Sequence, residues 1–387
     1  MNRTLLLCIL GTLTALAAVV NNMFSPAMPA IATTFGIEVP TAQLALTASL
    51  LGLAMGQVII GPLTDRLGRH KPLMMSMVML SLASVASLLS PSLTVLLALR
   101  LLQGLAAGGG IVIARSMASD MSQGSELIKT LAFINVFNGL GPIVTPMLGG
   151  ALTTSMGWQG PMVGILAIAL LLCVACAFVP ETLTADRRAG ATATSTLSLF
   201  NKVFTNRPCI FTILHQGMAL AVLFGNIALT PFLVSHYDYS PAYIGYFLGG
   251  NGIFTALGAG VAAAMGTALR GMRIASGGLL ATSAAMAVVL LGGMGLWAYE
   301  VVICLMLFFV GVTLTSSSGH AMDSARAQAG TASALLGAVG FVVGAVVAPL
   351  MGLGNLLTSA AIVYASAAVT CAVFTHLAAR ATAGQRS

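Results

Sequence analysis

Lysine and arginine are sorted into alternate gaps between long apolar stretches, and this sorting constrains the fold more than any other feature. Fifteen of the 16 basic residues fall in such gaps. They are Arg3, Arg66, Arg69, Lys71, Arg115, Lys129, Arg187, Arg188, Lys202, Arg207, Arg270, Arg273, Arg326, Arg380 and Arg386. The intervening gaps hold acids and no bases, namely Glu38, Asp238 and Glu300. Polytopic membrane proteins keep their basic loops in the cytoplasm, so the pattern predicts both the class and the topology.

The composition excludes an ordinary soluble protein. Hydrophobic residues make up 58% of the chain and charged residues 6%, with a mean hydropathy of +1.00. Soluble domains have charge on about a quarter of their residues. The net charge of +7 is spread singly over many gaps, so we expect a lipid bilayer and no nucleic acid as a partner.

The length fits an even number of spans. At about 32 residues for a helix and its loop, 387 residues give about twelve spans. Basic residues near both ends place both termini in the cytoplasm. The predicted spans are 5–27, 41–63, 73–90, 93–114, 129–151, 161–180, 209–232, 241–265, 274–295, 298–318, 329–350 and 356–378. A cleaved signal peptide over Arg3–Val20 is the alternative for the first span, but its removal would leave an odd number.

The longest polar break divides the chain into nearly equal halves. We predict an N-terminal six-helix bundle over 1–182, a cytoplasmic linker over 183–207 and a C-terminal six-helix bundle over 208–387. Two such halves are typical of transporters in which the substrate pathway runs between them.

Arg100 is the one basic residue inside an apolar stretch. It begins the sequence Arg100-Leu-Leu-Gln103-Gly104 in the fourth predicted span. A charge at membrane depth is costly and needs acceptors or a bound anion. Arg100 and Gln103 are therefore candidate substrate or coupling residues, and an arginine bonded only to neighbouring backbone is the alternative.

The gap after the second span carries the most specific motif. It reads Gly61-Pro-Leu-Thr-Asp65-Arg66-Leu-Gly68-Arg69 and resembles the loop between helices 2 and 3 of the major facilitator superfamily. The resemblance implies an all-α membrane fold of twelve helices in two pseudo-symmetric six-helix bundles. It also implies a gate in which Asp65 contacts the start of helix 11 and Arg69 pairs near the end of helix 4, where Asp120 is available. Arg66 is either part of that gate or only a topological anchor.

The fifth predicted span resembles an element that exporters of this superfamily carry. Its informative residues are Gly141, Pro142, Pro146, Gly149 and Gly150. Shorter matches along the chain, among them Pro26-Ala-Met-Pro29 and Pro180-Glu181-Thr182, resemble the drug:proton antiporters of the Bcr/CflA type. The resemblance implies efflux of small amphipathic molecules by alternating access, coupled to the proton gradient, from the bacterial inner membrane.

One position departs from that branch. Its first helix usually carries an acid before the Pro-Ala segment, and this chain has Asn22 there. An amide cannot titrate. All nine acids are expected in loops or at helix ends, which leaves His215 as the candidate titrating group in a span. A satisfied structural histidine is the alternative. A cavity with Arg100 and no acid would favour neutral or anionic substrates.

Further amides lie in the spans, where they either line a cavity or bond between helices. The candidates are Asn138, Asn226 and Asn251. The sequence has no catalytic constellation and no phosphate-binding loop, so we expect neither an enzyme nor a cofactor or metal. A monomer is expected. The alternatives are a metabolite or siderophore exporter, an uncoupled facilitator, and a membrane protein without transport.

Overall fold

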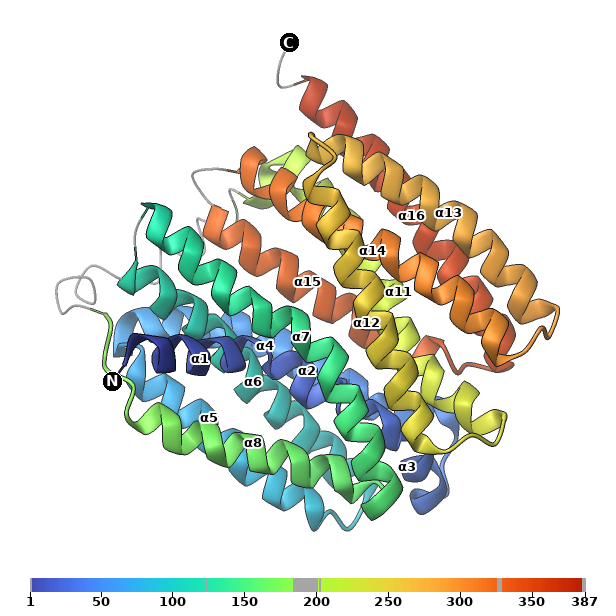
Figure 1. Cartoon of the computed structure of the whole chain (residues 1–387), viewed down its shortest axis with the longest axis horizontal. Helices are drawn as coiled ribbons and strands as arrows, with labels where there is room; N and C mark the ends of the chain where they lie inside the picture. The colour runs from blue at the N-terminus through green and yellow to red at the C-terminus, as the bar shows by residue number, and fades with distance from the viewer. Residues whose placement is uncertain (1, 123, 184–200, 202, 326–328, 385–387) are drawn as a thin grey trace. The chain divides into compact units, whose positions relative to one another are not determined.

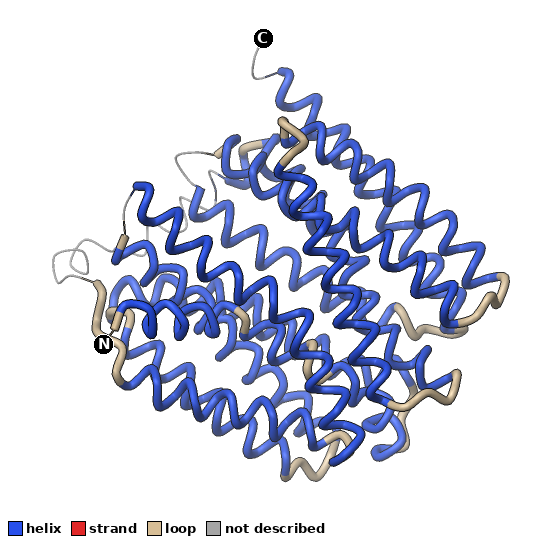
Figure 2. The backbone as a smooth tube through the Cα atoms, in the orientation of Figure 1, coloured by secondary structure: helices blue, strands red, loops and turns tan. Residues whose placement is uncertain are grey.

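The computed structural model describes residues 2–122, 124–183, 201, 203–325 and 329–384, and helices account for nearly all of them (Figures 1 and 2). No strand occurs in these ranges, which confirms the predicted all-α architecture. The first helices are α1 Arg3–Thr14, α2 Leu16–Asn21, η1 Ser25–Ala27, α3 Met28–Phe35, α4 Val39–Leu67, α5 His70–Leu88, α6 Leu93–Met121, α7 Gly124–Met156 and α8 Gln159–Ala177. The later ones are α11 Arg207–His236, α12 Pro241–Ala263, α13 Ala268–Leu291, α14 Leu296–Ser324, α15 Ala329–Leu350 and α16 Leu356–Gly384.

The helices match the predicted spans one for one. Within the described ranges, ten helices are long and apolar enough to cross a membrane, and the pair Arg3–Thr14 with Leu16–Phe35 forms an eleventh, bent by 46°. The twelfth, α7, is 33 residues long. At about 1.5 Å per residue it exceeds the roughly 30 Å of a bilayer's hydrocarbon core.

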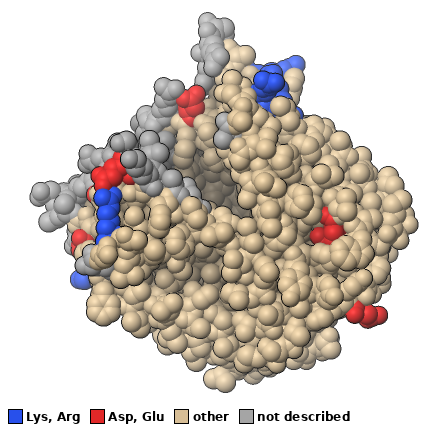
Figure 3. All heavy atoms as spheres, in the orientation of Figure 1, with Lys and Arg blue, Asp and Glu red and all other residues tan. Residues whose placement is uncertain are grey.

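The outer surface exposes many large apolar side chains, as expected for contact with lipid chains. Large apolar side chains such as Leu171, Phe178 and Ile362 are 69%, 73% and 63% exposed. Figure 3 shows a face that is almost free of charge across its middle. The helices run beyond the predicted spans, so Arg115, Lys129, Arg270 and Arg273 lie within the first or last two turns of helices rather than in loops.

The first span is broken where the sequence has Asn22 and Pro26. Residues Asn22–Phe24 form a turn between α2 and η1, and Met23 and Asn22 both donate their amides to the Ala18 carbonyl. Proline has no N–H to donate to the turn before it, which disfavours a continuous helix. A backbone carbonyl without an intrahelical partner needs another donor inside a membrane. Two carbonyls of this broken segment, those of Ala18 and Val20, take part in the candidate site.

The described chain divides into two compact units. The first comprises 1–193 with 239–249, and the second comprises 194–238 with 250–387. Most of the predicted linker, including Arg187, Arg188 and Lys202, lies outside the described residues. The predicted boundaries at 182 and 208 therefore remain a prediction.

The same set of helix pairs packs in both units. In the first, α5 packs on α8 and α6, and α7 packs on α1; in the second, α13 packs on α16 and α14, and α15 packs on α11. Numbered as membrane spans, the pairs in the first unit are 3·6, 3·4 and 1·5. The equivalent pairs in the second unit are 9·12, 9·10 and 7·11. This correspondence is what a duplicated half predicts.

Glycines allow one more mirrored pair to approach closely. A Cβ at Gly104 of α6 would overlap the Ser49 carbonyl of α4, and one at Gly52 would overlap the Leu101 carbonyl. In the second unit, a Cβ at Gly258 of α12 would overlap the Phe308 carbonyl of α14. Helices that lack side chains at the contact can pack backbone to backbone, which holds spans 2·4 and 8·10 together.

Candidate functional site

Arg100 is fully buried on α6 and its donors point at protein acceptors. Its Nη2 donates to the Val20 carbonyl at 2.9 Å, its Nη1 to Gln103 Oε1 at 2.9 Å and its Nε to the Ala45 carbonyl at 3.4 Å. The guanidinium carbon lies 4.0 Å above the ring of Phe24. Cation–π contact and carbonyl acceptors offset the cost of burying the charge without an acid.

Gln103 extends this cluster to two more helices. Its Nε2 donates to Ser84 Oγ of α5 at 3.0 Å and lies 3.7 Å from Met162 Sδ of α8. The two predicted residues therefore join α2, α4, α5, α6 and α8. This arrangement matches the structural alternative, because the cluster is closed by protein atoms.

The break in the first span supplies the acceptors. The Val20 carbonyl accepts from Arg100, and the Ala18 carbonyl accepts from Thr145 Oγ1 of α7 at 3.1 Å. Asn22 follows at the end of α2 and is 9% exposed. The neighbouring Asn21 Oδ1 is buried without a hydrogen-bond partner in the described chain. The position that replaces the usual acid thus lies beside unsatisfied polar atoms.

Glycines of the predicted exporter element in α7 pack closely against neighbouring segments. A Cβ at Gly149 would overlap the Met23 carbonyl, and one at Gly141 would lie 3.0 Å from Ala18 Cβ. Gly150 faces the start of α12 in the same unit, where a Cβ would lie 2.9 Å from the Pro241 carbonyl. Pro142 and Pro146 lie inside α7, which remains one helix. Asn138 lies one turn earlier, on the exposed side of α7.

Arg69 organises the loop between α4 and α5. Its Nε donates to Asp120 Oδ2 at 2.9 Å and its Nη1 to Asp65 Oδ1 at 2.6 Å and Thr64 Oγ1 at 2.7 Å. Asp120 at the end of α6 is the partner that the resemblance implies. Gly68 connects the two helices with φ of 91°, a conformation that favours glycine. Gly61 lies about two turns before Gly68, and its carbonyl accepts from Thr64 Oγ1 at 2.8 Å.

Two predicted members of the gate behave differently. Arg66 is exposed and forms none of the ion pairs found in the described ranges. Asp65 pairs with Arg69 and is 51% exposed. Its contact with the start of helix 11 remains a prediction.

The sequence analysis missed the role of Glu181 in this loop. Its Oε1 accepts from the Arg69 amide at 2.9 Å and its Oε2 from the His70 amide at 3.3 Å, so it caps the start of α5. Thr182 Oγ1 donates to Asp120 Oδ2 at 3.3 Å. The Pro-Glu-Thr segment after α8 thereby ties the sixth span to the gate. The available signal was the Pro180-Glu181-Thr182 match, but the helix start that Glu181 caps is about 110 positions away in the chain.

The charge state of Arg69 is set by competing effects. Burial of the guanidinium lowers the pKa of Arg69, but hydrogen bonds to Asp120 and Asp65 outweigh it and raise the pKa above its ordinary value. Arg69 therefore stays charged, and the two acids are held by a permanent cation.

His215 is fully buried on α11, and both ring nitrogens have partners. Nδ1 lies 2.9 Å from Ser317 Oγ of α14 and Nε2 lies 3.2 Å from Ser276 Oγ of α13. Ser276 is in turn 2.6 Å from Thr375 of α16. A neutral imidazole, with one donor and one acceptor, fits a shell of hydroxyls. The geometry matches the structural alternative.

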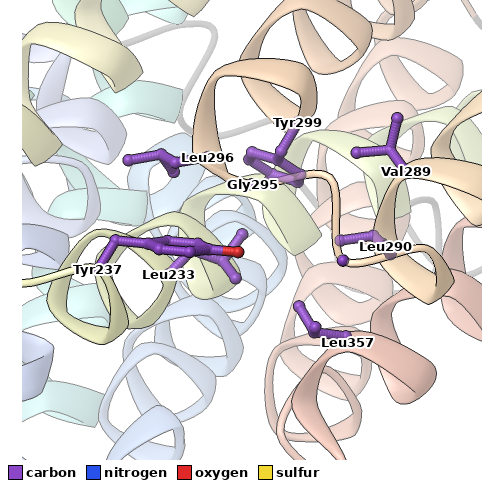
Figure 4. Close-up of a pocket in the computed structure, with 9 residues that line it drawn as sticks. Leu233, Tyr237, Val289, Leu290, Gly295, Leu296, Tyr299 and Leu357 are labelled. Atoms are coloured by element: carbon purple, nitrogen blue, oxygen red, sulfur yellow. The ribbon is translucent and has the colours of Figure 1, made fainter.

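Asn226 is held in a closed network. Its Oδ1 accepts from Thr230 Oγ1 at 2.8 Å and from Tyr299 Oη at 3.0 Å, and the Tyr299 and Tyr364 hydroxyls are 3.2 Å apart. The network joins α11, α14 and α16. Figure 4 shows Tyr299 above a small pocket lined largely by leucines of the same unit.

Asn251 leads to a correction. Its Nδ2 lies 3.3 Å from Oε2 of Glu300, and Glu300 is the fifth residue of α14 and only 5% exposed. The prediction that all nine acids lie in loops or at helix ends is therefore wrong for Glu300, which is buried one turn inside α14. The sequence pattern assigned it to the connector, although the predicted span 298–318 already contains it.

The two units have equivalent sets of membrane-length helices, packed around buried polar clusters. This arrangement defines the class of protein, a multi-pass membrane transporter. The chain belongs to the Major Facilitator Superfamily, whose sequence pattern it matches over residues 10–349. This confirms the family resemblance and the expectation of a transporter for small molecules rather than an enzyme.

Relatives and solved structures agree with that membership. The chain is 31% identical over 361 residues to the uncharacterized MFS-type transporter YdgK of Bacillus subtilis, covering 91% of this chain and 90% of that one. It is 30% identical over 219 residues to the chloramphenicol resistance protein CraA of Acinetobacter baumannii, covering 55% and 52%. The nucleoside transporter NupG (D323A mutant) matches 97% of this chain and 99% of its own with a TM-score of 0.72 at 13% identity, which shows the shared fold.

Proposed function

We propose that this chain exports small amphipathic molecules, including antibiotics, by alternating access coupled to the proton gradient. The observation that carries the proposal is the α7 element, whose Gly149 and Gly150 allow backbone packing on the broken first span and on α12. A relative named for chloramphenicol resistance supports it. The proposed setting is the bacterial inner membrane, with both termini cytoplasmic and the protein as a monomer, supported by the sidedness of the basic residues.

Neutral compounds are the favoured substrates in this proposal. Arg100 donates to the Val20 and Ala45 carbonyls and to Gln103, so it does not present an open cation to an anionic ligand. Uncharged amphipathic drugs need only apolar walls and a few hydrogen bonds. Of the neutral or anionic substrates that the sequence analysis favoured, the anionic ones therefore lose their main support.

Drug susceptibility tests this proposal directly. In a strain that lacks its own exporters, expression of the chain is expected to raise the minimum inhibitory concentration of chloramphenicol several-fold above that of the empty vector. A proton ionophore is expected to restore drug accumulation. Unchanged susceptibility to a panel of neutral antibiotics, at verified expression, would contradict the proposal.

Asn22 favours a second candidate, an uncoupled facilitator. An amide at the position of the usual acid cannot carry a proton. A facilitator equilibrates its substrate but never concentrates it. Accumulation of chloramphenicol in proteoliposomes against its gradient, driven by an imposed pH difference, separates the two candidates.

A further inference from the structure

Glu300 is a carboxylic acid buried inside the second unit. It is 5% exposed, and its Oε1 has no hydrogen-bond partner in the described part of the chain. Its Oε2 faces the amide nitrogen of Asn251 at 3.3 Å, and Asn251 is itself 2% exposed. An acid with one neutral donor and one unsatisfied oxygen is a group that a purely structural role does not explain.

The partner of the acid, Asn251, lies well inside a membrane-length helix. Asn251 is the eleventh residue of α12, about 15 Å along the helix from Pro241 and so about halfway through a hydrocarbon core of roughly 30 Å. One turn after Glu300 on α14, Cys304 Sγ donates to Asn251 Oδ1 at 3.1 Å. Glu300 therefore reaches an interior amide although its own helix begins only at Leu296.

The surroundings contain no base to pair with it. The titratable groups close enough to interact electrostatically with Glu300 are Tyr299 and Cys304 of α14 and Tyr364 of α16. Asn251 on α12 does not titrate. On α13 the bases Arg270 and Arg273 lie at the opposite end, and on α11 His236 is exposed at the helix end. Glu300 takes part in none of the ion pairs formed by the described residues.

This geometry favours an acid that carries its proton. An ionised carboxylate removed from water without a cation or sufficient donors is costly, whereas the neutral acid is tolerated. Rearrangement of α12 and α14 that admitted water would reverse the balance. The same group can thus hold a proton in one conformation and release it in another.

We propose that Glu300 is the proton-binding acid that couples the pH gradient to export, with Asn251 as its positioning residue. This inference rests on the proposed function. The step is a simple ionisation: the carboxyl O–H bond breaks, the electron pair stays on the carboxylate and the proton passes to water, with no redox change. The other two candidates fit less well, because Asn22 cannot titrate and His215 has hydroxyls on both ring nitrogens.

Infrared spectroscopy tests the protonation state without any substrate. The difference spectrum between wild type and Glu300→Gln in purified protein at neutral pH is expected to contain a carboxylic-acid carbonyl band. The matched control is Glu38→Gln, which removes an exposed glutamate at the start of α4, and its difference spectrum should lack the band. Absence of the band in the Glu300 spectrum would overturn the proposal.

Transport in proteoliposomes tests the coupling role, with labelled chloramphenicol as the probe. Wild type and Glu38→Gln are expected to accumulate drug when a pH difference is imposed. Glu300→Gln should lose this accumulation at least tenfold but retain drug exchange at equal concentrations and equal pH. Glu300→Asp, which keeps a titratable group, should accumulate drug.

The outcomes separate the inference from the function beneath it. Accumulation by Glu300→Gln as strong as that of wild type would overturn the role of Glu300 and leave drug export standing. Loss of exchange and accumulation in both the Gln and Asp variants would also overturn it, since the site would then serve packing. If wild-type protein neither exchanges nor accumulates drug, the proposed function fails and the coupling role fails with it.

Discussion

Single residues in this protein are best understood through the acceptors that surround them. Arg100 and Glu300 are both buried in the structure, but the first has three oxygen acceptors and the second has one neutral donor. The first arrangement stabilises a fixed cation. The second leaves room for a change of charge. Identical burial therefore supports opposite interpretations of function.

Arg100→Lys is expected to destabilise the protein by roughly 2 kcal/mol or more. A single ammonium cannot reach Val20, Ala45 and Gln103 together, and each buried acceptor left unpaired costs about 1–3 kcal/mol. Denaturant unfolding of the purified protein in detergent measures the change. The exposed Arg66→Lys is the control, with an effect within about 0.5 kcal/mol. Unchanged stability with weakened drug binding would instead assign Arg100 to the substrate.

The two acids that pair with Arg69 are expected to contribute unequally to the free energy of unfolding. The Asp120 side chain is 7% exposed and that of Asp65 is 51% exposed. Asp120→Asn should cost about 3 kcal/mol of unfolding free energy, as for a broken buried pair, and Asp65→Asn at most about 1 kcal/mol. Thermal unfolding of both variants side by side checks this order. Equal losses would show that solvent does not screen the Asp65 pair.

The sequence identified residues that can be recognised from their neighbours in the chain. It missed residues whose role depends on partners far away in the chain. Arg100 stands out in an apolar stretch, and Arg69 and Asp120 come from a motif of fixed spacing. Glu300 depends on Asn251, which is 49 positions away, and on burial by other helices. Whether His215 is satisfied depends on partners from two other helices, and Asn226 depends on Tyr299 of α14 besides Thr230 of its own helix. No pattern along one chain contains that information.

At the scale of elements, glycine decides which helices touch. The spans themselves were predictable because apolar length and helix geometry are properties of one segment. The segment that each glycine packs against was not predictable, since α7 alone contains both crowded and open glycines. Gly149 meets backbone, whereas nothing lies within 4 Å of a Cβ at Gly139. The distinction comes from the broken first span, whose backbone is the neighbour.

Gly149→Ala is expected to abolish drug resistance and to lower stability, because its Cβ would overlap the Met23 carbonyl and separate α7 from the first span. Gly139→Ala is the matched control on the same helix. It should retain resistance and stabilise the helix by up to about 1 kcal/mol, the difference in helix propensity. Inhibitory concentrations and melting temperatures of both variants provide the measurement. Full activity in Gly149→Ala would contradict a role for this contact.

At the scale of the whole molecule, duplication and charge sidedness reinforce each other. The mirrored helix pairs require that equivalent spans run in equivalent directions, and the basic gaps independently assign those directions. Both depend only on properties summed over many residues, which is why the sequence could predict them. The two compact units are not single continuous halves of the chain, since residues 239–249 at the start of α12 join the first unit.

Accessibility labelling would test the topology on which the coupling proposal depends. In a cysteine-free background, Glu38→Cys and Asp238→Cys are expected to react with an impermeant maleimide on intact cells. Arg66→Cys, which is equally exposed, should react only after the membrane is permeabilised, because basic gaps stay in the cytoplasm. A reversed result would place the start of α14 at the cytoplasmic face. That outcome would contradict the positive-inside assignment of the basic gaps and the predicted cytoplasmic location of both termini.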